Sequence, residues 1–155
     1  MPVEFLLATT PEHYRSATIL FMEYAQWLGI DLSFQQFEEE IKEIGIQYGP
    51  PSGGIILCKE ENSFTGCAGV RMLHDDEAEL KRMYLRPEWQ GKGIGKQLLD
   101  HSLELARELG YKSIRLDTLD TLKAALKLYR ANGFKETPPY YNNPISGVVY
   151  MQKFL

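Results

Sequence analysis

A glycine-rich turn stands between a run that is typical of a strand and a run that is typical of a helix. It consists of Gln90, Gly91, Lys92, Gly93, Ile94 and Gly95. Glycine at a helix start costs roughly 1 kcal/mol relative to alanine, and a main chain that must approach a ligand closely would explain it. Backbone N–H groups at a helix N-terminus bind phosphate, and the helix dipole adds positive potential. We therefore predict a pyrophosphate site here, with added charge from Lys92 and Lys96.

Two other phosphate-binding motifs are excluded by their spacing. A P-loop requires G-x-x-x-x-G-K-[ST], but Gly95 and Lys96 are followed by Gln97, and the fifth residue before Gly95 is Gln90. A dinucleotide fingerprint requires G-x-G-x-x-G inside a βαβ unit, whereas this turn reads G-x-G-x-G and follows strands that look antiparallel. The turn therefore predicts a pyrophosphate site of another kind.

The elements that position this turn follow from hydrophobic periodicity and from residues typical of helix ends. We predict strands over 1–9, 55–60, 65–73, 77–85, 113–119, 134–137 and 147–155, and helices over 10–29, 33–45, 95–111 and 121–132. Thr10 is the predicted N-cap of the first helix. For the second helix we predict Ser33 as the N-cap, Gln36 in the capping-box position and Gly45 as the stop, with apolar residues from Phe34 onward at helical spacing.

Together these elements predict one α+β domain over residues 1–155, built around a mixed sheet. Their order is β-α-α-β-β-β-α-β-α-β-β. Within it, "LRPEWQGKGIGKQLL" resembles the acyl-CoA-binding signature [RQ]-x-x-G-x-[GA] of the GNAT superfamily of N-acetyltransferases, with Gln90, Gly93 and Gly95 in the signature positions. The segment "LYRANGF", residues 128–134, resembles a later segment of that family, and the element order matches nearly the whole chain. The resemblance implies a mostly antiparallel sheet and acetyl-CoA as the co-substrate.

Acetyl transfer to an amine requires a base for the amine, a donor for the thioester oxygen and an acid for the departing thiolate. For the base, the resemblance implies Glu79, six residues before Leu85, which matches the catalytic glutamate of the histone-modifying members; Glu77 is the weaker substitute. In a regular strand Glu79, Lys81 and Met83 point to one side. The alternative for Glu79 is a glutamate that is either solvated or held in a salt bridge with Lys81 or Arg82.

For the acid, Tyr129 aligns with the tyrosine that many relatives place near the sulfur, and a phenol with a pKa of about 10 stays protonated. The alternative is a helix tyrosine that packs on the sheet. For the thioester oxygen and the pantetheine arm, the resemblance implies backbone groups of Met83, Tyr84 and Leu85, next to a bulge. Arg130 is expected to reach a cofactor phosphate.

One position departs from the family pattern, at the start of the helix predicted over residues 121–132. Many relatives carry an Asn seven residues before the tyrosine, where this chain has Leu122. A side-chain amide contact to the pantetheine arm is therefore missing, and Thr121 or Asp120 is the expected substitute.

The resemblance implies that the first two helices and the last hairpin build the acceptor site. Its aromatic candidates here are Tyr24, Trp27, Tyr140 and Tyr141, with further aromatic residues such as Phe34 close in sequence. Aromatic walls with nearby acidic residues suit a small cationic amine. The leading function is acetyl transfer by direct attack of a small-molecule primary amine in a ternary complex. The alternatives are a protein lysine or N-terminal acetyltransferase and a non-catalytic acyl-CoA-binding module.

Composition limits the remaining classes. The chain has 155 residues and a formal net charge of −4, so no basic surface predicts a nucleic acid as the main partner. No apolar run approaches the ~18 residues of a membrane span, and the start lacks a basic n-region. Cys58 and Cys67 fit no zinc or redox spacing, so we expect no metal. The expected compartment is the cytoplasm, and a homodimer is compatible with the tyrosine-rich loop.

Overall fold

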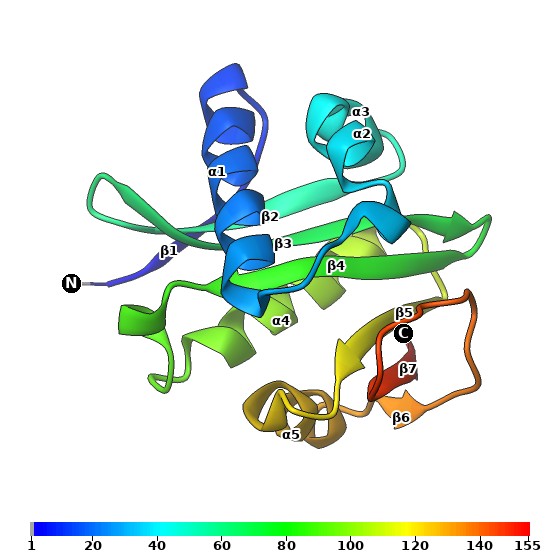
Figure 1. The fold of residues 1–155 in the computed structure, drawn as a ribbon. Helices are drawn as coiled ribbons and strands as arrows, with labels where there is room; N and C mark the ends of the chain where they lie inside the picture. The colour runs from blue at the N-terminus through cyan, green and yellow to red at the C-terminus, as the bar shows by residue number, and fades with distance from the viewer. Residues whose placement is uncertain (1) are drawn as a thin grey trace.

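The fold is a single twisted sheet with helices on both faces (Figure 1). The computed structural model describes residues 2–155, apart from the side chain of Phe34. Its elements are β1 Glu4–Leu7, α1 Pro11–Leu28, the 3-10 turn η1 Ser33–Gln35, α2 Phe37–Lys42, α3 Ile44–Gln47, β2 Gly54–Glu60, β3 Ser63–His74, β4 Glu77–Leu85, the 3-10 turn η2 Pro87–Trp89, α4 Ile94–Glu108, β5 Ser113–Leu119, α5 Lys123–Ala131, β6 Lys135–Glu136 and β7 Val148–Phe154.

The strands lie in the order β1-β2-β3-β4-β5-β7-β6, and every neighbouring pair is antiparallel except β4 and β5. This confirms the predicted α+β fold with a mixed, mostly antiparallel sheet. The parallel pairing of β4 with β5 covers only Glu77 to Glu79 opposite Ser113 to Arg115. Beyond Glu79 the two strands separate, so the sheet is split in its middle.

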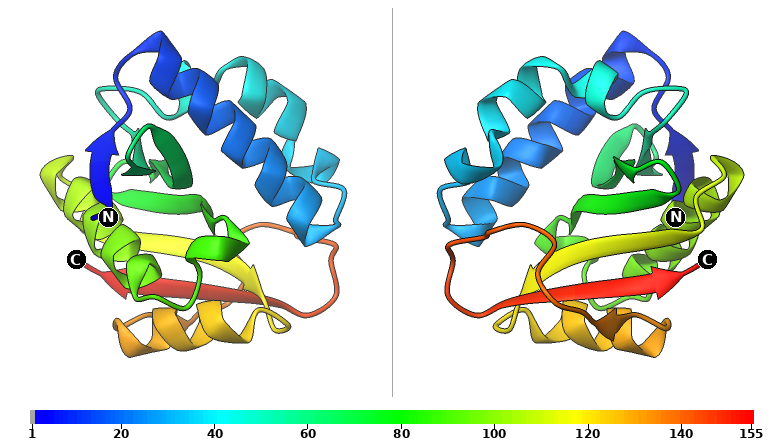
Figure 2. Two further views of the ribbon diagram at one scale, coloured as in Figure 1. Left: turned by 90° about the vertical axis from the view of Figure 1, so that its left-hand side faces the viewer. Right: turned by 90° about the vertical axis from the view of Figure 1, so that its right-hand side faces the viewer.

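Two apolar cores cover the two faces of the sheet. Helices α1 to α3 pack on one face and α4 and α5 on the other, as the two side views show (Figure 2). The core under α1 includes Phe21, Tyr48 and Cys67, whereas the core under α4 includes Leu98, Leu103 and Cys58. The two cysteines are therefore free, buried and on opposite faces of the sheet.

The helix ends were predicted correctly for α1 and wrongly for the next segment. Thr10 caps α1 by accepting the His13 N–H, and Gly29 ends it in the left-handed region. Ser33 and Gln36 do not form a capping box, because the Asp31 carboxylate accepts the Ser33 N–H in a local turn and Gln36 adopts a φ of 57°. The predicted stop, residue 45, instead lies inside α3. The predicted contacts of Phe34 lie outside the described side chains.

A bulge in β4 changes which way its side chains point. Cys67 and Gly69 of β3 pair with Tyr84 and Lys81 of β4, so β4 has one extra residue, and Arg82 has a φ of 57°. After the bulge Met83 packs on the α4 side, while Glu79 and Lys81 form contacts on the α1–α3 side. The prediction that Met83 shares a side with Glu79 is therefore wrong, because the strand is not regular.

Candidate active site

A cleft of about 530 Å³ opens where β4 and β5 separate. We call this the large cleft. Its walls come from the end of β4, the glycine-rich turn with the start of α4, the end of β5, one side of α5, and Tyr24 and Trp27 of α1. Beyond Glu79 no residue of β5 pairs with β4, so the β5-facing backbone groups of the bulged segment are left for a ligand. The cleft therefore combines a long opening with unpaired main chain.

The glycine-rich turn forms one end of the large cleft. Gly91 and Gly93 have φ values of 76° and 79°, which other residues rarely adopt, and an added Cβ at either would meet open space. Gly93 is the N-cap of α4 and makes no side-chain capping bond, so the first N–H groups of α4 stay open to an anion. The Gln90 amide donates to the Leu85 carbonyl oxygen at 2.8 Å and fixes the turn to the end of β4.

Most residues predicted to bind the cofactor line this cleft. They are Met83, Tyr84, Leu85, Gln90, Gly91, Gly93, Gly95 and Lys96. Three predicted residues do not line it. Ile94 is 7% exposed and packs in the core under α4, the Lys92 side chain is exposed, and Arg130 pairs with Glu136 at 3.0 Å on the outer side of α5.

The second helix N-terminus at the cleft belongs to α5. Leu122 stands at its N-cap position and makes no side-chain capping bond, as its apolar side chain requires. Thr121, Lys123 and Ala124 line the large cleft, whereas Asp120 does not. Of the two predicted substitutes for the missing Asn, only Thr121 is therefore in place to contact a ligand.

Tyr129 reaches the large cleft from α5. The residue is 6% exposed, and its ring packs edge-on against Phe134 at 5.6 Å between centroids. Burial raises the pKa of Tyr129 well above its ordinary value of about 10, and the charge of Asp117 acts in the same direction. Among the described residues its hydroxyl has no hydrogen-bond partner. The phenol is thus protonated and free to donate to a ligand in the cleft.

A second, small cavity of about 50 Å³ adjoins the large cleft on the side of α1 and η1. We call it the small cavity. Six residues line both spaces, namely Tyr24, Leu80, Arg82, Asp117, Thr118 and Leu122. Its polar part adds Gln35, Lys81 and Asn143, and its remaining wall is aliphatic. The two spaces therefore meet beside Asp117 and Arg82.

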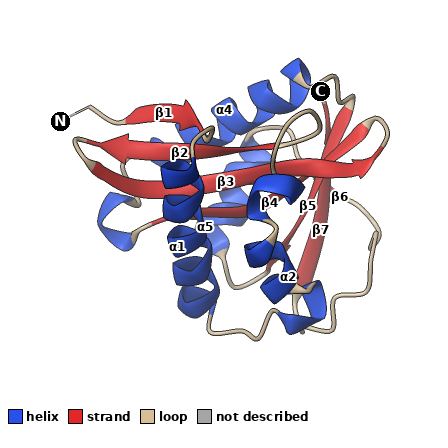
Figure 3. Cartoon of the chain, turned by 90° about the horizontal axis from the view of Figure 1, so that it is seen from above, coloured by secondary structure: helices blue, strands red, loops and turns tan. Residues whose placement is uncertain are grey.

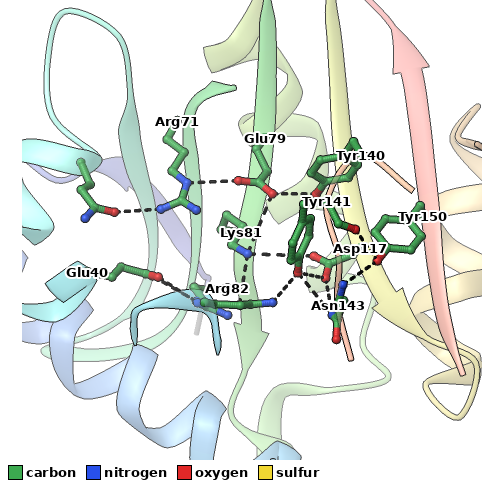
Figure 4. A network of polar contacts seen from close by, with 12 residues as sticks. Glu40, Arg71, Glu79, Lys81, Arg82, Asp117, Tyr140, Tyr141, Asn143 and Tyr150 are labelled. Carbon is green, nitrogen blue, oxygen red and sulfur yellow. Dashed lines mark hydrogen bonds and ion pairs between the residues drawn. The ribbon is translucent and has the colours of Figure 1, made fainter. Parts of the chain in front are cut away.

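Glu79 lies in a buried polar network on the α1–α3 side of the sheet (Figure 4). Arg71 Nε donates to one of its oxygens at 3.1 Å, and the Tyr140 hydroxyl donates to the other at 2.6 Å. Lys81 Nζ lies 3.9 Å from the second oxygen. Glu79 lines neither the large cleft nor the small cavity. Glu77 lies further from the opening and is held by Ser113, Arg115 and Gln152.

Asp117 of β5 is the carboxylate that borders both spaces. Its side chain is 9% exposed, and one of its oxygens accepts from the Tyr141 hydroxyl and from Asn143 Nδ2 at 2.8 Å. Its other oxygen is 4.0 Å from Lys81 Nζ, too far for a hydrogen bond. Asp117 therefore keeps one oxygen without a close donor.

The four predicted acceptor residues divide into two pairs. Tyr24 and Trp27 line the large cleft, and their rings lie 5.8 and 6.0 Å from that of Tyr84. Tyr140 and Tyr141 line neither space; their rings are half-buried, and their hydroxyls hold Glu79 and Asp117. The loop between β6 and β7 that carries them runs out beside the edge of the sheet (Figure 3).

Sequence reasoning missed Asp117 and Lys81. The signal that was available is the presence of charged residues inside two strands that otherwise carry core residues, "EAELKRMYL" and "SIRLDTL". Buried charged residues are rare unless they are paired or functional. Within residues 2–155 no group of His, Cys, Asp and Glu is arranged to hold a metal ion, and no helix is long and apolar enough to cross a membrane.

Comparison with protein families and with known proteins finds N-acetyltransferases. The model of the Acetyltransferase (GNAT) family matches residues 17–134. An uncharacterized N-acetyltransferase of Schizosaccharomyces pombe is 40% identical over 144 residues, which cover 92% of this chain and 88% of that protein. An aminoglycoside N(6')-acetyltransferase type 1 of Stenotrophomonas maltophilia is 27% identical over 78% of this chain and 87% of its own length.

Solved structures share the fold over the whole chain. An acetyltransferase from Streptococcus agalactiae superposes with a TM-score of 0.81 at 21% identity, covering 99% of this chain and 98% of that chain. A GNAT family acetyltransferase from Elizabethkingia anophelis with acetyl-CoA bound has a TM-score of 0.69 at 23% identity, covering 99% and 98%. The chain belongs to the GNAT family and is an acetyl-CoA-dependent N-acetyltransferase.

Proposed function

We propose that the protein acetylates the primary amine of a small molecule by direct attack on acetyl-CoA in a ternary complex. The observation that supports this proposal most directly is that the large cleft and the small cavity meet at one carboxylate, that of Asp117. The large cleft has the shape and main-chain donors that acetyl-CoA requires, and the small cavity reaches it beside Asp117. A ternary complex follows because each substrate has its own space and the two spaces share a wall.

In this proposal the open N-terminus of α4 holds the pyrophosphate, and the unpaired backbone of β4 near Leu85 binds the pantetheine arm and the thioester oxygen. Asp117 accepts one proton from the ammonium group of the acceptor. The neutral nitrogen forms a bond to the thioester carbon, and the carbon–sulfur bond then breaks. Tyr129 donates a proton to the leaving sulfur, and the second proton of the new amide nitrogen restores the phenol.

Asp117 is preferred to Glu79 as the proton acceptor because of its position. Asp117 borders both spaces, whereas both oxygens of Glu79 accept hydrogen bonds inside the network. Lys81 Nζ links the two carboxylates, at 3.9 Å from Glu79 and 4.0 Å from Asp117. Glu79 is then a positioning residue that holds Lys81 and Tyr140 in place.

A small acceptor is favoured over a protein substrate by the size of the acceptor space. The small cavity of about 50 Å³ has room for a few atoms, and the loop that carries Tyr141 is tied to η1 by a 2.6 Å bond from Gln35. A peptide needs an open groove. The name of the Stenotrophomonas maltophilia relative, an aminoglycoside acetyltransferase, gives independent support for a small-molecule acceptor.

The test measures thiol release from acetyl-CoA against a panel of amines, amino acids, polyamines and peptides. We expect turnover with small molecules and stabilisation by acetyl-CoA of about 2.7 kcal/mol at 100 times its Kd. No stabilisation would overturn the proposal. Stabilisation without turnover of any acceptor would favour a binding module, and turnover of peptides alone would favour a protein acetyltransferase.

The two carboxylates are separated by their pH–rate profiles. Asp117→Asn should lower kcat by ~10²-fold or more, with a loss that shrinks at high pH, where more of the amine is already neutral. Glu79→Gln should lower kcat less and keep the wild-type shape of the profile, because the amide can still accept from Tyr140. The reverse pattern would assign the base to Glu79.

A further inference from the structure

The small cavity contains a buried ammonium group that is short of acceptors. The Lys81 side chain is 4% exposed, and Lys81 lines the small cavity. An ammonium group can donate three hydrogen bonds. Lys81 makes one, to Gln35 Oε1 at 3.2 Å, because the nearest oxygens of Glu79 and Asp117 are 3.9 and 4.0 Å away. Two of its three donor positions therefore have no hydrogen-bond acceptor among the described residues.

The other cations around this site already have partners of their own. Arg82 forms two bonds to Glu40, at 2.8 and 3.0 Å, and Arg71 donates to Glu79 and to Gln47. Lys81 differs from both because its carboxylate neighbours are close enough for electrostatic attraction but too far for hydrogen bonds. Burial lowers the pKa of Lys81, which the neighbouring carboxylates partly offset. An oxyanion placed in the cavity would satisfy this group.

The charges where the large cleft meets the small cavity indicate which charged groups the acceptor carries. Asp117 needs an ammonium group, and Lys81, 4.0 Å away, needs an oxyanion. A cation alone or an anion alone would leave an added charge buried, which is costly, whereas a molecule that carries both keeps the local charge balanced. We propose that the acceptor is an α-amino acid, whose amine lies at Asp117 and whose carboxylate binds Lys81.

The rest of the cavity agrees with this class of acceptor. Leu28, Ile30, Leu32, Leu119 and Ile145 line the small cavity. An aliphatic wall favours an apolar side chain on the amino acid. Two acidic residues close to the aromatic candidates are not free to bind a cationic amine, because Glu23 is paired with Arg86 at 2.7 Å and Glu40 with Arg82. Asp117 is the only acidic residue among the described residues that line the small cavity, so a second ammonium group of a polyamine would find no carboxylate there.

This inference rests on the proposed function, since it names the substrate class of the same site. The test compares matched acceptors in the thiol-release assay, namely alanine, valine and leucine, their amides, and the amines left when their carboxylates are removed. We expect kcat/KM for the acids to exceed that of the other two sets by ~10-fold or more, because only the acids bind Lys81 through a charged hydrogen bond. The amides have more acidic ammonium groups, so they supply more neutral amine and make the comparison stringent.

The variant Lys81→Met keeps the length of the side chain and removes the charge. It should abolish the preference for acids, so that the ratio of kcat/KM between each acid and its plain amine falls to about one whatever the variant does to turnover as a whole. Lys112→Met is the matched control, because Lys112 is exposed and far from both spaces. Equal kcat/KM for acids and amines in the wild type would overturn the inference and leave the proposed function standing. This comparison needs no variant, so a misfolded Lys81→Met does not affect it.

A binding measurement covers the case in which no member of the panel turns over. With CoA present, leucine should raise the unfolding temperature of the wild type and not that of Lys81→Met, and 3-methylbutylamine should raise neither. A shift with leucine that depends on Lys81 supports the inference even if acetyl transfer to amines is not observed. No shift with any acid in a protein that is stabilised by acetyl-CoA overturns it.

Discussion

Tyr129→Phe is the change that separates an acid from a packing residue most cleanly. It removes one hydroxyl and keeps the ring, which packs against Phe134 at 5.6 Å between centroids. Among the described residues the hydroxyl has no hydrogen-bond partner, so its loss breaks no bond within the protein. The free energy of unfolding should therefore change by less than about 1 kcal/mol, the net value of one typical hydrogen bond.

The catalytic effect should be larger than the effect on stability. If Tyr129 donates its proton to the leaving sulfur, kcat should fall by ~10-fold or more, which corresponds to about 1.4 kcal/mol of transition-state stabilisation. Burial holds the pKa of Tyr129 above its ordinary value, so the wild-type enzyme should keep this acid protonated throughout a normal assay range. A loss of kcat in a fully folded variant is then a chemical effect.

The assay compares acetyl-CoA with an analogue whose thiol is more acidic, at saturating concentrations of one acceptor. A better leaving group needs less protonation, so the defect of Tyr129→Phe should shrink with the analogue. Tyr14→Phe is the control, because Tyr14 lies on α1 outside both spaces. An equal loss with both donors would refute the acid role and make Tyr129 a positioning residue, and an unchanged kcat would leave it a core residue.

One further variant tests the glycine-rich turn, and another tests the ion pair between Glu40 and Arg82 at the bulge in β4. Gly95→Ala should raise the Kd of acetyl-CoA by ~10-fold in calorimetry without loss of stability, because alanine favours the helix and the new Cβ would meet protein atoms only at 3.6 and 3.8 Å; Gly45→Ala in α3 is its control, and an unchanged Kd would place the pyrophosphate elsewhere. Glu40→Gln should lower the free energy of unfolding in urea by about 3–5 kcal/mol, because it leaves Arg82 buried without its counter-charge. Burial alone would raise the pKa of Glu40, but the hydrogen bonds and charge of Arg82 lower it, so this contribution is complete above the ordinary carboxylate pKa of about 4.3 and is lost as the pH falls through the lower folded value. The free energy of unfolding of Glu40→Gln should therefore fall less steeply with pH in this acid range than that of the wild type. A urea midpoint and a pH dependence equal to those of the wild type would contradict the stabilising role of the Glu40–Arg82 pair.

The features that sequence analysis predicted correctly are those fixed by local chemistry. Thr10 and Gly29 delimit α1 because capping depends on residues within one turn. The glycine-rich turn was located because positive φ values at Gly91 and Gly93 need residues without a Cβ. Gln36 could not be predicted in the same way, because glutamine rarely adopts a φ of 57° and its own type gives no signal for it.

The candidate site was less accessible to sequence analysis because its contacts join distant segments. Lys81 contacts Gln35 of η1, and Asp117 is held by Tyr141 and Asn143 of the loop after β6. Each of these residues is an ordinary polar residue in its own segment. Only the parallel pairing of β4 with β5, and its end at Glu79, brings them to one junction.

The bulge in β4 accounts both for the large cleft and for the free donors of Lys81 at the small cavity. Arg82 adopts a φ of 57°, which costs an arginine about 1–3 kcal/mol, and its two bonds to Glu40 offset that cost. The extra residue also places Arg82 on the same face as Lys81, its neighbour in sequence. Because Arg82 neutralises Glu40, Lys81 is not required there and keeps two donors open toward the small cavity. The same irregularity ends the pairing with β5, so one local distortion opens the large cleft and provides the charge that, in our proposal, recognises the acceptor.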